Sequence, residues 1–353
     1  MSDIGIEALD AVLQILRPDE RWLRKDDRSF TWLPFRLAQT VSVSPVFDDH
    51  GVVLSKLTAR TIVAERVAAP ELVVYRVLSE LNRHALGGGY CYLSREQRVE
   101  ATAVAFVHHE TLDWRATQFS AFAILQLGMT QAEATYIADK CAGQVAVVSD
   151  PERGRPEEPD PFVGSIDQNW ARQGRAASRF CDRDEFNTIQ HVVEHSTRAA
   201  TLGAYAKGIA MEFPFAEETS FARLDADEPH RRIGSGLRVR LFLPVEGTED
   251  ELVERANTLN RAEALGGSET MYYGAWCLDA GASDGDKPRL QYQVFFPNAF
   301  HRVGVAQDAS YGVARRAQWV DWGMHGVASA VDPRTVMMHN VRTWLKQQSP
   351  IQD

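Results

Sequence analysis

Hydrophobic and polar positions follow two periods along this chain, and the periods come in the same order in both halves. Apolar spacings of three and four predict amphipathic helices, and runs rich in Val, Thr, Phe and Ile predict strands. In the first half we expect helices at 4–16, 69–86 and 113–141, and strands at 29–47, 52–67, 90–93 and 99–108. In the second half we expect helices at 183–198, 249–264, 308–322 and 333–346, strands at 202–215, 237–245, 271–278 and 289–296, and a charged loop at 222–232.

A short sequence occurs twice at the same place in this order. Leu-Asn-Arg followed by Ala-Leu-Gly-Gly lies at 81–88 and, with one inserted residue, at 259–267. The glycines are expected to supply the positive φ that ends a helix and turns the chain into a strand. The strand before each copy also matches, 57–63 against 237–243. The sequence therefore predicts two diverged copies of one domain.

A segment rich in proline and charge separates the two copies. Its Asp-Pro, Arg-Pro and Glu-Pro steps bias the residue before each proline away from helix, so we expect an extended linker. The predicted division is a first domain at 1–148, the linker at 149–178, a second domain at 179–330 and a C-terminal helix and tail at 331–353.

Composition narrows the classes of partner. The 353 residues carry a formal net charge of -10, which repels phosphate backbones, so nucleic acid is not an expected partner. The chain has no apolar stretch of membrane-spanning length and no signal-like start, so we expect no membrane insertion and a cytoplasmic location. The four cysteines lack metal or disulfide spacing and are predicted to be buried free thiols: Cys91, Cys141, Cys181 and Cys277.

One stretch could carry metal chemistry. In His191-Val192-Val193-Glu194-His195 the two histidines share one side of a predicted helix, and Glu194 could act on a zinc-bound water, as in the inverted zincin pattern. Glu263 or Glu269 could be the third ligand, but neither lies in a convincing motif. The alternative is a solvated helix face, so the main interpretation has no metal and no cofactor.

Other chemical motifs give no positive case for an enzyme. His108-His109-Glu110 is expected to be an exposed turn, because neighbouring strand residues point to alternating faces. Gly87-Gly88-Gly89 lacks the Lys-Ser/Thr of a phosphate-binding loop and leads from helix to strand, the wrong order for such a loop.

Aromatic residues on the two long helices are better suited to binding. Large side chains of this kind often anchor protein interfaces, although most are core residues. The candidates are Trp114, Phe119, Phe122, Tyr311, Trp319 and Trp322. Sheet edges are a second candidate, because an unpaired edge can accept an extended peptide.

The order of elements resembles the domain shared by type III secretion chaperones and the YbjN family. The residues behind the resemblance are the two Leu-Asn-Arg and Ala-Leu-Gly-Gly junctions, the strand after each, and the long helices that begin near Trp114 and Asp308. The resemblance implies an α+β fold with two tandem copies of a helix and antiparallel-sheet domain, packed as an internal pseudo-dimer.

The same resemblance implies a non-enzymatic, chaperone-like or adaptor protein of the bacterial cytoplasm that holds a peptide segment of a protein client. The chain would be a monomer with internal pseudo-symmetry or a homodimer. Two alternatives stay open: a zinc-dependent hydrolase that uses His191, Glu194 and His195, and a structural scaffold subunit of a bacterial complex.

Overall fold

The computed structural model describes residues 3–49, 52–161, 163, 180, 183–196, 201–205, 208–215, 218–230, 233–265, 273–279, 287–302 and 304–325. In the first half the helices are α1 (Ile4–Leu16), η1 (Glu20–Trp22), α2 (Glu71–Asn82) and α3 (Leu112–Lys140). The strands are β1 (Leu23–Asp26), β2 (Ser29–Trp32), β3 (Gln39–Val43), β4 (Phe47–Asp49), β5 (Val52–Glu65), β6 (Gly89–Leu93), β7 (Arg98–Val107) and β8 (Gln144–Val145).

Apart from the short elements η1, β4 and β8 and a second 3-10 helix, the described second half has the same kinds of element in the same order. Its helices are α5 (Arg183–Ser196), α6 (Glu249–Leu265), η2 (Asn298–Phe300) and α7 (Val305–His325). Its strands are β9 (Thr201–Tyr205), β10 (Gly208–Phe215), β11 (Glu218–His230), β12 (Gly234–Leu243), β13 (Ala275–Asp279) and β14 (Arg289–Pro297). None of the described helices has the length and apolar content needed to cross a membrane.

Each half builds an antiparallel sheet with the same strand order. Within the described residues the first sheet runs β1-β2-β3-β5-β7-β6, with β4 and β8 paired to β5, and the second runs β9-β10-β11-β12-β14-β13. The registers also agree: Arg60 lies opposite Thr102, and Arg240 lies opposite Gln293 at the corresponding place. The fold is therefore α+β with two antiparallel sheets, as the sequence predicts, and the matched strands 57–63 and 237–243 occupy equivalent positions.

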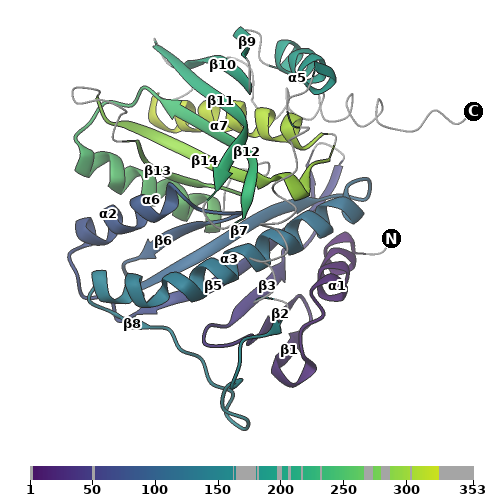
Figure 1. Ribbon diagram of the computed structural model, residues 1–353, viewed down its shortest axis with the longest axis vertical. Helices are drawn as coiled ribbons and strands as arrows, with labels where there is room; N and C mark the ends of the chain where they lie inside the picture. The colour runs from purple at the N-terminus through teal and green to yellow at the C-terminus, as the bar shows by residue number, and fades with distance from the viewer. Residues whose placement is uncertain are drawn as a thin grey trace, which may run out of the picture.

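One face of each sheet is covered by helices. In the first half α1 and α3 pack on β5 and β7 (Figure 1), and in the second half α7 packs on β10, β11 and β12. Along β5 the covered positions Leu57, Ala59 and Val63 are fully buried, while the alternate positions Thr58 and Arg60 are partly exposed. This period of two leaves partly exposed positions on the other face, along β2, β3 and β5 in the first sheet and along β11 and β12 in the second.

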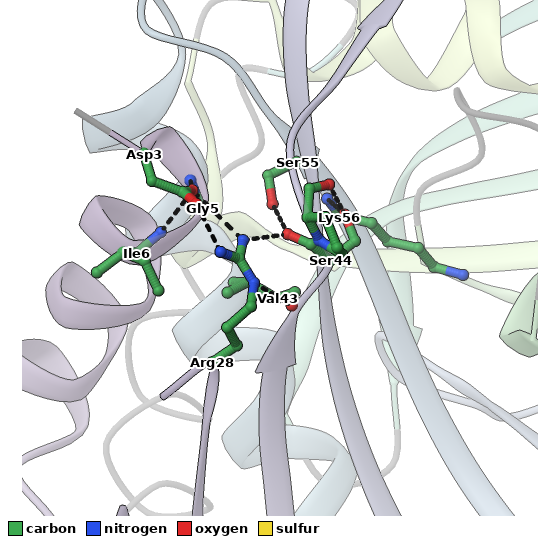
Figure 2. Close-up of polar contacts among 9 residues, drawn as sticks. Asp3, Gly5, Ile6, Arg28, Val43, Ser44, Ser55 and Lys56 are labelled. Carbon is green, nitrogen blue, oxygen red and sulfur yellow. Dashed lines mark hydrogen bonds and ion pairs between the residues drawn. The ribbon is translucent and has the colours of Figure 1, made fainter. Parts of the chain in front are cut away.

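The start of α1 is joined to the first sheet by a polar cluster (Figure 2). Asp3 accepts from the main-chain N–H groups of Gly5 at 2.9 Å and Ile6 at 3.3 Å, as an N-terminal cap does. Its other carboxylate oxygen accepts from Arg28 at 2.5 Å. Arg28 also donates to the carbonyl of Ser44, which accepts from the Ser55 hydroxyl at 2.9 Å. Helix and sheet are therefore locked together at this end.

Asp3→Asn is expected to remove part of the acid sensitivity of folding. The bond from Arg28 holds the pKa of Asp3 below its usual value, and the main-chain bonds lower it further. A lowered carboxyl pKa contributes stability that is complete above the unfolded pKa and is lost as the pH falls through the folded one. The free energies of unfolding of the native protein and of Asp3→Asn, measured with urea, should differ near neutral pH and become equal in strong acid. Asp27→Asn, in an exposed turn, is the control, and a difference that is constant with pH would contradict the assignment.

Most predicted elements are confirmed, and four predictions are wrong. Residues 29–47 are not one strand, because β2 and β3 form an antiparallel pair within them and β4 begins at Phe47. Residues 202–215 are not one strand but the antiparallel pair β9 and β10. The stretch 222–232 is not a loop, because its residues up to His230 belong to β11, which pairs with β12. Helix α2 ends at Asn82, before its glycines, and Gly87, with φ of +70°, makes the turn towards β6 instead. The helix predicted at 333–346 lies outside the described residues.

The described start of the proline-rich segment packs on the first half. Asp150 forms an ion pair with Arg24 at 2.9 Å, and the N–H of Asp160 donates to the carbonyl of Pro34 at 2.8 Å. Helix α6 begins with a capping box: Glu251 accepts from the N–H of Thr248 at 2.8 Å, and the N–H of Glu251 donates to the Thr248 hydroxyl at 3.3 Å.

Candidate binding surfaces

The aromatic candidates on α3 divide between core and surface. Phe119 and Phe122 are fully buried. The ring of Phe122 lies 4.2 Å from that of Tyr273 in the second half, so its role is to hold the halves together. Neither phenylalanine can contact a client in this structure. Trp114 is partly exposed, and the guanidinium of Arg115 lies 3.9 Å from the centre of its ring.

The candidates on α7 do not join those on α3 in one groove. Tyr311 and Trp319 are partly buried, and Trp319 packs against the core. The side chain of Trp322 lies outside the described residues, so its role stays a prediction. The two described cavities, each of about 20 Å³, are lined by none of the six aromatic candidates. Each cavity has room for about one water and not for a large side chain.

The metal motif lies on a helix, as predicted, but its geometry stays open. His191, Glu194 and His195 belong to α5, and their side chains are outside the described part. Glu263, one of the two possible third ligands, is engaged elsewhere, by Arg316 at 3.0 Å and by the indole N–H of Trp276 at 2.6 Å. Glu269 is not described. Among the described residues, no group of three or more metal-ligating side chains is present.

The other chemically interesting residues have structural surroundings. His108 and its neighbours form the predicted turn, and burial, with Arg115 and His109, lowers the pKa of His108 to about 4. The described cysteines are free and buried. Burial raises the pKa of Cys91 and of Cys277 to about 12, so neither is a reactive thiolate near neutral pH. These two cysteines occupy equivalent strand positions, opposite Glu100 and Gln291.

The two halves meet through α2, α6, β6 and β13 (Figure 1). The amide of Asn82 binds both main-chain groups of Tyr90, at 2.8 and 3.0 Å, and that of Asn260 binds both groups of Trp276, at 2.8 and 2.9 Å. The repeated Asn is therefore the residue that joins each helix to its own edge strand.

The residue three positions before each Asn reaches across to the other half. Ser79 accepts from the N–H of Leu278 at 2.8 Å, and Asn257 accepts from the N–H of Tyr92 at 2.8 Å. Tyr92 and Leu278 are themselves equivalent, two residues after Tyr90 and Trp276. Contacts of this reciprocal kind are what a two-fold dimer interface has, here within one chain.

The open face of each sheet has an arginine cluster around one buried acid. In the first sheet Glu100, only 3% exposed, accepts from Arg60 at 2.6 Å and pairs also with Arg98. In the second sheet Asp225, 5% exposed, accepts from Arg223 at 2.8 Å and Arg240 at 2.6 Å. Arg60 and Arg240 are the equivalent residues noted above.

Sequence reasoning missed these clusters, although a signal was present. Alternating arginines such as Arg238 and Arg240 lie within the matched strands, on the polar side of a period-two pattern. The partner acid of Arg240 lay in the stretch predicted to be a loop. The second open face also has an aromatic pair: Phe221 and Phe242 lie opposite each other and stack with ring centroids 6.1 Å apart.

Comparison of the chain with models of protein families, with curated proteins and with solved structures finds no match to any of them.

Proposed function

We propose that this protein binds an extended segment of a partner protein, as a chaperone-like or adaptor protein, and catalyses no reaction. The observation that carries the proposal is the pairing of two sheets with the same strand order, each with partly exposed positions on one face, along β2, β3 and β5 in the first and β11 and β12 in the second. The reciprocal contacts of Ser79 and Asn257 support it, because they make a rigid two-fold platform. The resemblance to secretion chaperones agrees with it.

The open faces suit a peptide better than a small molecule. Thr40, Ser42 and Thr58 on the first face are partly exposed and offer hydroxyl groups across neighbouring strands. An extended peptide can use such groups over a long contact, whereas small-molecule sites are usually concave and largely apolar. The proposed client therefore lies across β3 and β5.

Site-specific photo-cross-linking in cells would test the proposal. A benzophenone amino acid at Thr58 or Thr40, on the open face, is expected to capture one protein partner. The matched control is the same group at Gln14, which is exposed on α1, in the helix layer that covers the other face. No adduct from either open-face position, or the same adducts from Gln14, would contradict the proposal. Metal analysis would test the hydrolase alternative. One zinc per chain that is lost when His191 and His195 are replaced would favour it.

A further inference from the structure

A proline-rich segment runs along the outer side of the first sheet. Residues 148–160, here called the strap, follow β8 and pass beside β1 and β2 (Figure 1). Main-chain bonds hold both ends: the N–H of Val148 donates to the carbonyl of Arg36 at 3.0 Å, and that of Asp160 donates to the carbonyl of Pro34 at 2.8 Å. The strap is therefore anchored to the connection between β2 and β3.

The middle of the strap is held by exposed side chains. Asp150 pairs with Arg24 of β1 at 2.9 Å, and Arg153 donates to the carbonyl of Arg21 at 2.7 Å. The Arg24 side chain is 64% exposed, so solvent screens its ion pair and the pair contributes little to stability. These contacts can therefore break while both ends of the strap stay bound.

The strap also lacks the main-chain pairing that would make it a strand of the sheet. Pro151, Pro156 and Pro159 have no N–H to donate. Among the described residues, its one bridge is internal, between Asp150 and Gly154, and β1 pairs with β2 alone. Because no ladder of main-chain bonds joins the strap to β1, its middle part is easily displaced.

The strap lies at the outer end of a row of residues on the open face. Arg24, Thr31, Thr40 and Arg60 lie opposite one another on β1, β2, β3 and β5. Opposite residues share a face, and the hydroxyl oxygens of Thr31 and Thr40 are 2.8 Å apart. Neighbouring strands are about 4.8 Å apart, so the row spans roughly 14 Å, the length of about four extended residues. A longer client segment that follows the row outward meets the strap.

We propose that the strap is a displaceable cover over the outer end of the client site, and that a partner segment competes with it for the space beside Arg24. The inference rests on the proposed function and adds its regulation. While Asp150 is paired with Arg24, the client reaches only the inner part of the row, around Thr40 and Thr58. When the pair breaks, the middle of the strap moves away and the client extends over Thr31.

Limited trypsin digestion of the full chain would measure opening of the strap without a partner. Cleavage after Arg153 requires that residue to leave Arg21, so its rate reports the open population. Asp150→Asn keeps the Oδ1 atom that accepts from the N–H groups of Glu152 and Arg153 but removes the charge that pairs with Arg24. It is expected to raise the rate about twofold to fivefold, the effect of losing one exposed ion pair.

Two further variants show whether the ion pair is the cause. Glu157→Gln makes the same change of charge at an exposed residue of the strap and should leave the rate unchanged. Arg24→Gln should match Asp150→Asn, and the double variant should add nothing, because both changes break one contact. Equal rates for the native protein, Asp150→Asn and Glu157→Gln would overturn the inference.

Cross-linking in cells would show whether the strap limits the client. A benzophenone amino acid at Thr31 is expected to capture about twofold to fivefold more partner in Asp150→Asn than in the native protein, relative to the same group at Thr58. An unchanged ratio, with adducts from Thr58, would overturn the inference and leave the proposed function standing. Absence of adducts from both Thr58 and Thr40 would overturn the proposed function, and the inference with it.

Discussion

Replacing Glu263 with Gln is expected to lower the free energy of unfolding by about 3 to 5 kcal/mol, the usual cost of leaving a buried charge without its partner. Arg316 is almost completely buried, at 2% side-chain exposure, and lies under the ring of Tyr292. Both Glu263 oxygens accept from it, at 3.1 and 3.0 Å. Gln keeps the shape of the side chain but removes the charge that compensates the guanidinium.

Urea unfolding followed by tryptophan fluorescence would measure the change in the free energy of unfolding. Trp276 reports on this part of the structure because its indole also donates to Glu263. Glu254→Gln is the matched control, on the same helix with an exposed side chain, and is expected to change little. If both variants unfold at the same urea concentration, the buried pair does not stabilise the second half.

Gly274→Ala is expected to lower the free energy of unfolding by about 2 to 5 kcal/mol. Alanine is strained in the left-handed backbone conformation of this position, and its added Cβ overfills the core. Gly274 has φ of +81°, and an added Cβ would lie 2.6 Å from the carbonyl oxygen of Gln293 and still closer to the buried ring of Tyr292. Neither neighbour can move, because Gln293 belongs to β14 and the Tyr292 hydroxyl donates to the carbonyl of Tyr273 at 2.8 Å.

Gly128→Ala is the opposite case within the same chain. Gly128 lies inside α3, and an added Cβ would meet no atom within 4 Å. Alanine there should raise the free energy of unfolding by about 0.5 to 1 kcal/mol, because it restricts the unfolded chain. Thermal unfolding of the two variants should therefore shift in opposite directions. A loss of stability in both would mean that glycine in α3 has a role that the contacts do not show.

The helices and the repeat could be predicted because their signals are local. The cap at Asp3 and the capping box at Thr248 and Glu251 lie within a few residues of the helices that they start. The strand β11 was missed because it contains Asp225 and Pro229, residue types that strands disfavour. In the sheet Asp225 pairs with Arg223 and with Arg240 of the neighbouring strand, a contact that the local sequence does not reveal.

The exposure of the candidate binding residues was harder to predict, for a related reason. Helix α3 is buried on most of its circumference, between the first sheet and the second half, so its sequence has no clear polar face. Nothing in the sequence distinguishes Phe119 and Phe122, which are core, from Trp114, which is partly exposed.

Joining the two copies in one chain frees them from having to stay identical. In a homodimer every substitution changes the same surface of both subunits, so one surface cannot acquire a different sequence from the other. Here the contacts from Ser79 to Leu278 and from Asn257 to Tyr92 keep the two-fold frame while its two surfaces differ. One has the arginines around Glu100, and the other has the stacked Phe221 and Phe242. A single molecule thus carries two different surfaces at a fixed spacing, which dilution cannot separate.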